Sequence, residues 1–373
     1  MELKFIRRMG IFDKILGKKN PEKQIGTYKE FWDWFLTKEK TFFEIVKNRE
    51  HIEEQFFDIM APELSKINDG YYFLAGMCNE NTAELIITVE GDVKKMIFAE
   101  ELVAAAPEIE NWKFTALKPE TNIENVGIRM NECEFTKDNI YFYSNEIEGY
   151  PDEIDLAFVY ENLTEENKGS ATTGICIFLD NFLGELNFAT QIDTFGIIGK
   201  NEAEKELVPI EKLKEFLLWR EREFTEKYKD LQTLENEDQF SLLEATLENG
   251  MPLMATVNAS LLKYDAKASY PWISVLKISY DGSNNNGFPE EKDYNTMNII
   301  EDYAAEILTP ENGHLYIGRE TADSCKSIYF ASKDFRQPSK VFDQIIKDNP
   351  QYKISLEIYK DKYWQSFEHY NVN

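Results

Sequence analysis

The chain has 373 residues, of which 43% are apolar and 14% aromatic. It is therefore long enough for two or three domains and apolar enough to bury a large core, which excludes wholesale disorder. Its 41 Lys and Arg face 68 Asp and Glu, a formal net charge of −27, which disfavours general nucleic-acid binding and suits a basic protein partner.

The N-terminal 20 residues differ from the rest because basic side chains outnumber acidic ones there, and apolar residues such as Phe5, Ile6 and Phe12 lie at helix-compatible spacing. Two interpretations are open. One is an amphipathic element that contacts an anionic membrane surface or a partner's groove. The other, which we favour, is a frayed tail, because single short helices are marginal in water. We therefore predict residues 1–26 to be a basic amphipathic or disordered tail, and we expect no membrane span.

Residues 27–235 predict an N-terminal α+β domain, with helices on one face of a mostly antiparallel sheet. Helical spacing of apolar residues predicts helices at residues 27–47, 53–67, 94–105, 171–188 and 210–229. Alternating patterns bounded by turn residues predict strands at residues 71–78, 84–89, 112–117, 132–143, 154–160 and 194–198. This order loosely repeats strand–strand–helix–strand, but the halves share no residue-level similarity that would indicate an internal repeat.

The acidic segment 231–238 is the predicted boundary to a C-terminal domain at residues 236–373. Its elements follow the order β-α-β-β-α-β, which is the ferredoxin-like arrangement. They are expected at residues 273–280, 294–308, 315–319, 327–331, 339–347 and 352–360. A strand near 253–261 could extend this sheet. The predicted fold class is thus α+β, with two-layer antiparallel sheets that carry helices on one face.

Alternation in the C-terminal domain assigns side chains to two faces of its sheet. The face expected under the two helices carries Leu315, Ile317, Ile328, Phe330, Ile354, Leu356 and Ile358. The opposite, open face is expected to carry three tyrosines: Tyr316, Tyr329 and Tyr359. Base stacking on these rings is disfavoured by the acidic charge and by the lack of a Lys/Arg-Gly-Phe run. We expect this face to pack against the N-terminal region or a second copy of the chain.

Three more residues are candidates for binding: Arg319, Asp361 and Trp364. They would form a small polar site at the sheet edge. The competing interpretation, which we favour, makes Trp364 a core residue and Asp361 a turn-former.

Motifs for catalysis, metal or cofactor binding are not found. GxSxG, HExxH, GxGxxG after a strand and the Walker loop are missing from the sequence. The loop at 281–292 has Asn286 and Lys292 where a calcium loop needs Gly and Glu. The four cysteines are far apart, as is typical of reduced thiols in a cytosolic protein. We therefore predict no cofactor, no metal site and no catalytic residue.

The C-terminal stretch resembles the domain of unknown function 695 over roughly residues 240–370. The resemblance rests on short motifs: Tyr270-Pro271-Trp272, Gly287-Phe288-Pro289, Gly318-Arg319 with Thr321, and Lys360-Asp361 with Trp364. Residues 84–91 and 100–119 are similar to segments of uncharacterised bacterial proteins with this tail. The family resembles in topology the B-type protein regulator of ribonuclease E, a small acidic inhibitor, which implies a binding or regulatory role by analogy.

Two functional hypotheses follow. The first is an acidic, cytoplasmic, bacterial-type module for protein–protein interaction or regulation, without a cofactor, whose partner is another protein or a second copy. The alternative is a hydrolase or transferase with a site in the cleft between the two regions.

Overall fold

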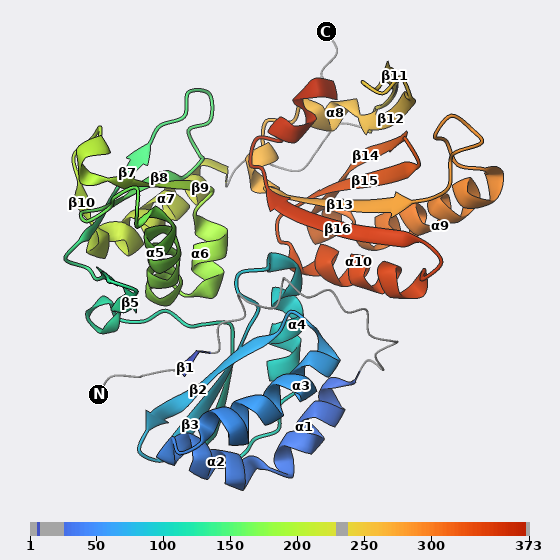
Figure 1. Cartoon of the computed structure of the whole chain (residues 1–373). Coiled ribbons are helices and arrows are strands. Elements are labelled where there is room, and N and C mark those ends of the chain that lie inside the picture. Colours follow the sequence, from blue (N-terminus) through green and yellow to red (C-terminus); the bar gives the residue numbers. More distant parts are fainter. Residues whose placement is uncertain (1–5, 8–25, 229–237, 371–373) are drawn as a thin grey trace. The chain divides into compact units, whose positions relative to one another are not determined.

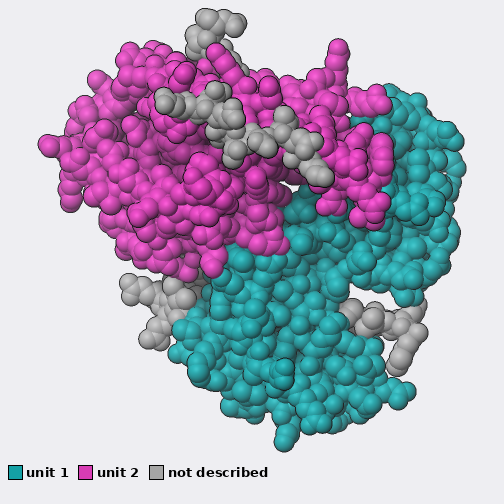
Figure 2. Space-filling view, turned by 180° about the vertical axis from the view of Figure 1, so that it is seen from behind, with its two compact units in different colours: residues 1–145, 154–217 teal, residues 146–153, 218–373 magenta. Residues whose placement is uncertain are grey.

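A computed structural model describes residues 6–7, 26–228 and 238–370 (Figure 1). The chain forms two compact units, coloured separately in Figure 2. Unit 1 comprises residues 1–145 and 154–217, and unit 2 comprises residues 146–153 and 218–373. Most of the predicted tail and of the predicted boundary segment lies outside the described residues, so the boundary near residue 235 stays a prediction.

The first sheet of unit 1 has the order β1-β2-β3-β4, with β1 at Ile6–Arg7, β2 at Tyr72–Asn79, β3 at Thr82–Thr88 and β4 at Trp112–Ala116. Its helices are α1 (Tyr28–Leu36), α2 (Glu39–Asn48), α3 (Asp58–Ile67, preceded by a π-helical turn at Glu53–Phe57) and α4 (Val93–Ala104). The hairpin β2–β3 is antiparallel, whereas β3 and β4 are parallel and joined through α4.

The helix predicted at residues 27–47 is in fact two helices. α1 begins with a capping box between Thr27 and Glu30. It ends at Leu36, and the hydroxyl of the next residue, Thr37, donates to the Trp34 carbonyl (2.7 Å). A side chain that bonds to a local carbonyl in this way competes with the helical hydrogen-bond ladder, which explains the break.

The second sheet of unit 1 has the order β10-β7-β8-β9, formed by β7 (Ile140–Asn145), β8 (Asp155–Tyr160), β9 (Thr194–Gly199) and β10 (Val208–Pro209). A separate ribbon pairs β5 (Ile128–Met130) with β6 (Cys133–Phe135). The helices are α5 (Lys168–Leu183), α6 (Glu185–Gln191) and the first residues of α7 (Leu213–Tyr228), which from residue 218 onward belongs to unit 2. Gly184 separates α5 from α6 with a φ of 82°, and a Cβ there would lie 2.8 Å from the Glu120 nitrogen.

Unit 1 therefore corrects the prediction in two respects. Its strands form two separate main sheets instead of one, and each is mixed, because β3–β4 and β8–β9 are parallel. A strand that returns to the same sheet through a helix runs parallel to its predecessor. The strand–strand–helix–strand order was predicted, but the parallel pairing that the connecting helix produces was missed.

Unit 2 is built on a six-stranded sheet with the order β11-β12-β14-β15-β13-β16, in which all neighbours are antiparallel. The strands are β11 (Phe240–Thr246), β12 (Pro252–Asn258), β13 (Trp272–Ser279), β14 (His314–Ala322), β15 (Cys325–Ser332) and β16 (Lys353–Lys360). The helices are α8 (Ala259–Leu262), α9 (Glu291–Ile307), α10 (Arg336–Asp348) and a 3-10 helix at Gln365–Tyr370.

The two faces of this sheet carry different cores. Figure 1 shows α9 and α10 together on one face, where apolar helix residues pack on strands β13 to β16. This helix-side core includes Ile328, Phe330, Ile354 and Leu356, as their alternation predicts. The other core includes residues from all six strands and is covered by α8 and the C-terminal 3-10 helix. The face predicted to be open is thus covered, at least in part, by elements of unit 2 itself, and its packing against the N-terminal region or a second copy stays a prediction.

Strand β14 reverses the predicted faces. Leu315 and Ile317 lie in the core under α8 and the 3-10 helix, while Tyr316 packs against the helix-side core. A β-bulge between Tyr316 and Gly318 then shifts the alternation, so that Arg319 also reaches the helix side. Gly318 is required there because a Cβ would lie 2.2 Å from the Thr256 carbonyl oxygen. Alternation groups side chains by face, but it does not say which face a helix covers.

Candidate functional site

The six residues predicted to bind do not form one site. Two of them, Tyr316 and Arg319, meet at Glu301 of α9, whose exposed fraction is 5%. Arg319 Nη1 lies 2.9 Å from Glu301 Oε1, and Lys326 Nζ lies 2.6 Å from Oε2. The Tyr316 hydroxyl also donates to Glu301. Burial by itself would raise the pKa of Glu301, but Lys326, Tyr316 and Arg319 together hold that pKa below its usual value.

Two other predicted residues, Tyr329 and Tyr359, line a small pocket of about 180 Å³ on the opposite face. Tyr329 and Tyr370 both donate to Glu320. Burial is the main cause that raises the pKa of both hydroxyls, so they remain protonated at neutral pH. This pocket is too small for most organic ligands, for which several hundred Å³ is usual.

The remaining two, Asp361 and Trp364, have contacts within the C-terminal turn and core. The Asp361 carboxylate accepts the backbone N–H groups of Gln365 and Ser366, each at 2.9 Å, and so begins the 3-10 helix. Trp364 is 1% exposed, and its indole N–H donates to the Tyr270 carbonyl (3.0 Å). Asp361 is connected to Tyr359 through the Ser366 hydroxyl. A binding role for these residues stays a prediction.

An exposed apolar surface lies on the helix side of β11 and β12. Phe240, Leu242 and Met254 are 49%, 61% and 38% exposed, and we call these three residues the β11–β12 surface. The strand register places Leu242 opposite Thr256 and Glu244 opposite Met254, so these side chains share one face. The helix-side core includes no residue of β11 or β12. Sequence reasoning missed β11, because the polar segment that precedes this strand was interpreted as a linker.

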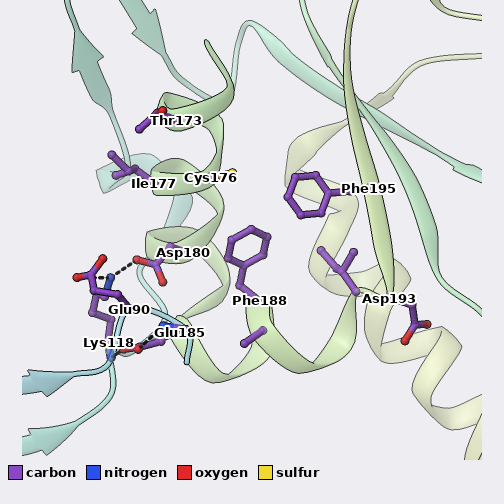
Figure 3. A pocket seen from close by; sticks show the side chains of 13 residues that line it. Glu90, Lys118, Thr173, Cys176, Ile177, Asp180, Glu185, Phe188, Asp193 and Phe195 are labelled. Carbon is purple, nitrogen blue, oxygen red and sulfur yellow. Dashed lines mark hydrogen bonds and ion pairs between the residues drawn. The ribbon is translucent and has the colours of Figure 1, made fainter. Parts of the chain in front are cut away.

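Unit 1 contains a larger pocket, of about 450 Å³ (Figure 3). One wall is a single face of α5, formed by four side chains at positions i, i+3, i+4 and i+7: Thr173, Cys176, Ile177 and Asp180. Figure 3 shows Phe188 and Phe195 opposite this helix. The other lining residues are Glu90, Gly91, Lys118, Glu185, Ala189, Ile192 and Asp193.

Charged groups gather at one end of the unit 1 pocket. The side chain of Lys118 is 6% exposed, and its Nζ lies 2.5 Å from Asp180 Oδ2 and 3.4 Å from Glu90 Oε1. Burial raises the pKa of Asp180 despite the opposing effect of Lys118. Burial, with a smaller contribution from Asp180, also raises the pKa of the Cys176 thiol.

A buried carboxylate connects this end of the pocket to the first sheet. Glu185, 1% exposed, accepts four hydrogen bonds. The donors are the N–H groups of Val89, Gly91 and Lys118 and the hydroxyl of Thr88, at 2.6–3.0 Å. Sequence reasoning missed this pocket, although Asp180 in an otherwise apolar helix was a usable signal, because a carboxylate in such a position needs a partner.

Two kinds of feature are missing from the described part of the chain. Among the described residues, no cluster of three or more His, Cys, Asp or Glu side chains is arranged to hold a metal ion. In the same residues, no helix has the length and apolar character needed to cross a membrane.

Comparison with known proteins identifies one family. Residues 245–370 match a family of unknown function, DUF695. This match confirms the resemblance indicated by the motifs of the C-terminal part. No curated protein and no solved structure matches the chain. Similarity to the regulator of ribonuclease E is not shown by these comparisons.

Proposed function

We propose that this chain is a cytoplasmic protein-binding module of regulatory type, and that the β11–β12 surface receives its partner. One observation carries the proposal: the helix-side core extends over β13 to β16, whereas β11 and β12 add two more strands to the same sheet. Phe240, Leu242 and Met254 are consequently exposed side by side. Contiguous exposed apolar side chains beside polar ones are typical of protein interaction sites.

The proposed partner is an amphipathic helix with an apolar stripe and basic flanks. Such a helix would continue the layer formed by α9 and α10, since helices pack on the apolar face of a sheet. Its basic flanks are argued from charge. Glu301 of α9 faces β14, and the exposed residues Glu291 and Asp302 lie on the same side of this helix. Glu244 is exposed on β11. Lysine or arginine on the partner would complement these carboxylates.

The geometry favours binding over nucleophilic catalysis. In the unit 1 pocket, the raised pKa of Cys176 keeps its sulfur as a thiol, which is a poor nucleophile. Asp180 is already paired with Lys118. No histidine lines this pocket among the described residues. The hydrolase or transferase hypothesis therefore gains no support from this pocket.

We also propose a ferredoxin-like fold for unit 2, extended by two strands. The order β14-β15-β13-β16, with antiparallel neighbours and α9 and α10 as connections, supports this proposal. The four free cysteines, none in a disulfide among the described residues, fit the proposed cytoplasmic location.

The test is site-specific photocrosslinking in the native host. A photoreactive amino acid replaces Leu242, and a matched chain carries it at Leu218, which is also exposed (49%) and belongs to unit 2. We expect position 242, and not position 218, to yield one product whose crosslinked peptide comes from a basic amphipathic helix. Purified partner should then bind Leu242→Lys at least tenfold more weakly than Leu218→Lys.

Three outcomes would overturn the proposal. A product that joins two copies of this chain would assign the surface to self-association. A crosslinked peptide with acidic flanks would contradict the charge argument. Equal products, or none, at positions 242 and 218 would show that the β11–β12 surface is not an interaction site.

A further inference from the structure

Arg319 connects the β11–β12 surface with a charged cluster, which consists of Glu301, Lys326 and Arg319 itself. The strand register pairs Leu242 with Thr256 and Thr256 with Arg319, so these side chains form one row on the helix side of the sheet. Neighbouring strands are about 4.8 Å apart, which places the backbones of Leu242 and Arg319 roughly 10 Å apart. Because a helix with its side chains is about 10–12 Å wide, a partner helix that packs on Leu242 also reaches Arg319.

Aromatic rings join the β11–β12 surface to the same cluster. The rings of Phe240 and Tyr316 lie with centroids 5.9 Å apart, and the Tyr316 hydroxyl donates to Glu301. Phe240 is 49% exposed, so the apolar surface continues into the charged cluster on one side of the sheet. A partner that covers the β11–β12 surface therefore meets the exposed end of this cluster.

The cluster contains more positive than negative charge. Glu301 supplies one carboxylate, whereas Lys326 and Arg319 are both cations. Lys326 Nζ also contacts the neutral amide oxygen of Asn298, at 2.8 Å. Burial lowers the pKa of Lys326, but the adjacent Glu301 favours its ammonium form. Among the described residues, no carboxylate other than Glu301 forms an ion pair with either cation, so one positive charge is in excess.

Exposure decides which of the two cations a ligand can contact. The side chain of Lys326 is 4% exposed, whereas that of Arg319 is 36% exposed. Arg319 donates to Glu301 through Nη1 alone, at 2.9 Å. A guanidinium has five N–H donors in a planar fork, so Arg319 retains donors for a second anion.

We propose that Arg319 binds a carboxylate of the partner, which is an aspartate or glutamate within the apolar stripe of its helix. This inference rests on the proposed function for the source of the carboxylate. One carboxylate neutralises the excess charge, whereas a phosphate dianion would leave negative charge beside Glu301 and the exposed Glu244. A guanidinium can hold a carboxylate with two parallel hydrogen bonds, which would fix the register of the partner helix.

The first test uses small probes and needs no partner. Phenylbutyrate carries a carboxylate on an apolar stem, and phenylbutylamine and phenylbutanol provide the same stem with a cationic and a neutral group. NMR of the full-length chain follows the Nε–H signal of Arg319, identified by its loss in Arg319→Gln. We expect phenylbutyrate at millimolar concentration to shift this signal, and the other two probes to leave it unchanged.

The second test repeats the photocrosslinking at position 242 in chains that also carry Arg319→Gln. We expect the yield of the specific product to fall roughly tenfold, because a charge-assisted contact is lost. Arg319→Lys keeps the charge without the fork and should reduce the yield less. The crosslinked peptide should contain Asp or Glu among apolar residues at helical spacing.

A matched variant separates this site from general charge effects. Lys277 is 38% exposed, is also paired with one glutamate, Glu357, and lines the small pocket on the opposite face. Lys277→Gln should therefore leave both the phenylbutyrate shift and the crosslinking yield unchanged. Thermal unfolding should show each variant folded, since Lys326 still pairs with Glu301 in Arg319→Gln.

The two tests distinguish failure of this inference from failure of the proposed function. A product at position 242 that is unaffected by Arg319→Gln, or whose peptide lacks an acidic residue in its stripe, would overturn the inference alone. Equal shifts with phenylbutyrate and phenylbutylamine, or none with either, would do the same. A phenylbutyrate-specific shift without a specific product at position 242 would instead overturn the helical partner and retain the carboxylate site.

Discussion

Glu185 of unit 1 and Glu301 of unit 2 are both buried, and their charges are stabilised in different ways. Glu185 of unit 1, at 1% exposure, is surrounded by three backbone N–H groups and one hydroxyl. Glu301 of unit 2, at 5% exposure, is surrounded by the side chains of Lys326, Arg319 and Tyr316. Buried charges are tolerated only when they are paired or hydrogen-bonded, and these sites represent the two solutions.

The type of donor determines whether a buried glutamate and its partners can be replaced together by apolar residues. The backbone N–H groups around Glu185 are present whatever residue occupies position 185. If that residue offers no acceptor, no second substitution can remove these unpaired donors. The cation that faces Glu301 is a side chain, so the pair can be exchanged for apolar residues together. Three predictions follow from this comparison.

The largest effect is expected from Glu185→Ala. It leaves four donors without their acceptor, three of them on the buried residues Thr88, Val89 and Lys118, and we expect a loss of about 5 kcal/mol in the free energy of unfolding of unit 1. Urea denaturation measures the loss, and hydrogen exchange should accelerate at the amides of Val89, Gly91 and Lys118. Glu108→Ala, at an exposed position of the same unit, should change stability by less than about 0.5 kcal/mol. Unchanged exchange at these amides would contradict the role assigned to Glu185.

The second prediction concerns repair at Glu301. Glu301→Ala leaves the buried Lys326 ammonium, 3% exposed, without its carboxylate, and we expect a loss of about 3–4 kcal/mol. The double variant Glu301→Leu with Lys326→Met should recover most of this loss, because Arg319 is exposed enough to turn towards solvent. Chemical denaturation of both variants measures the recovery, with Glu306→Ala on the exposed side of α9 as control. If the double variant is as unstable as the single one, the pair is not replaceable and the comparison fails.

The smallest effect is a difference in acid sensitivity. The pKa of Glu301 is lowered in the folded state from its usual 4.5, so its contribution is present above that value and is lost as the pH falls through the folded pKa. The pKa of Asp180 is raised from 3.8, so protonation in that range favours folded unit 1.

Hydrogen exchange between pH 5 and pH 3 should therefore show protection falling in α9 and β15 before it falls in α5, after correction for the intrinsic exchange rate. Glu301→Gln should make the loss in unit 2 shallower, because the substituted side chain does not titrate. Parallel loss in the wild type and in Glu301→Gln would refute the assigned cause.

Much of the local structure could be predicted from the sequence. The strands predicted at residues 71–78 and 154–160 correspond to β2 and β8, and the alternation in β15 and β16 places Ile328, Phe330 and Leu356 together in the helix-side core. These features depend on neighbours within a few residues, which a single sequence displays directly. The candidate sites were predicted less well, because the carboxylate contacts of Tyr316, Arg319 and Lys118 come from other elements.

What the sequence determined by itself is the type and order of the elements, including the β-α-β-β-α-β order of the C-terminal part. Tertiary structure alone decided the parallel pairs of unit 1, the bulge that turns Arg319 towards Glu301, and the pocket beside Lys118. The physical reason is the separation along the sequence between the residues that interact. Periodicity reports one element's own faces, whereas Glu185 finds its donors 67–97 residues away, and only the folded chain brings them together.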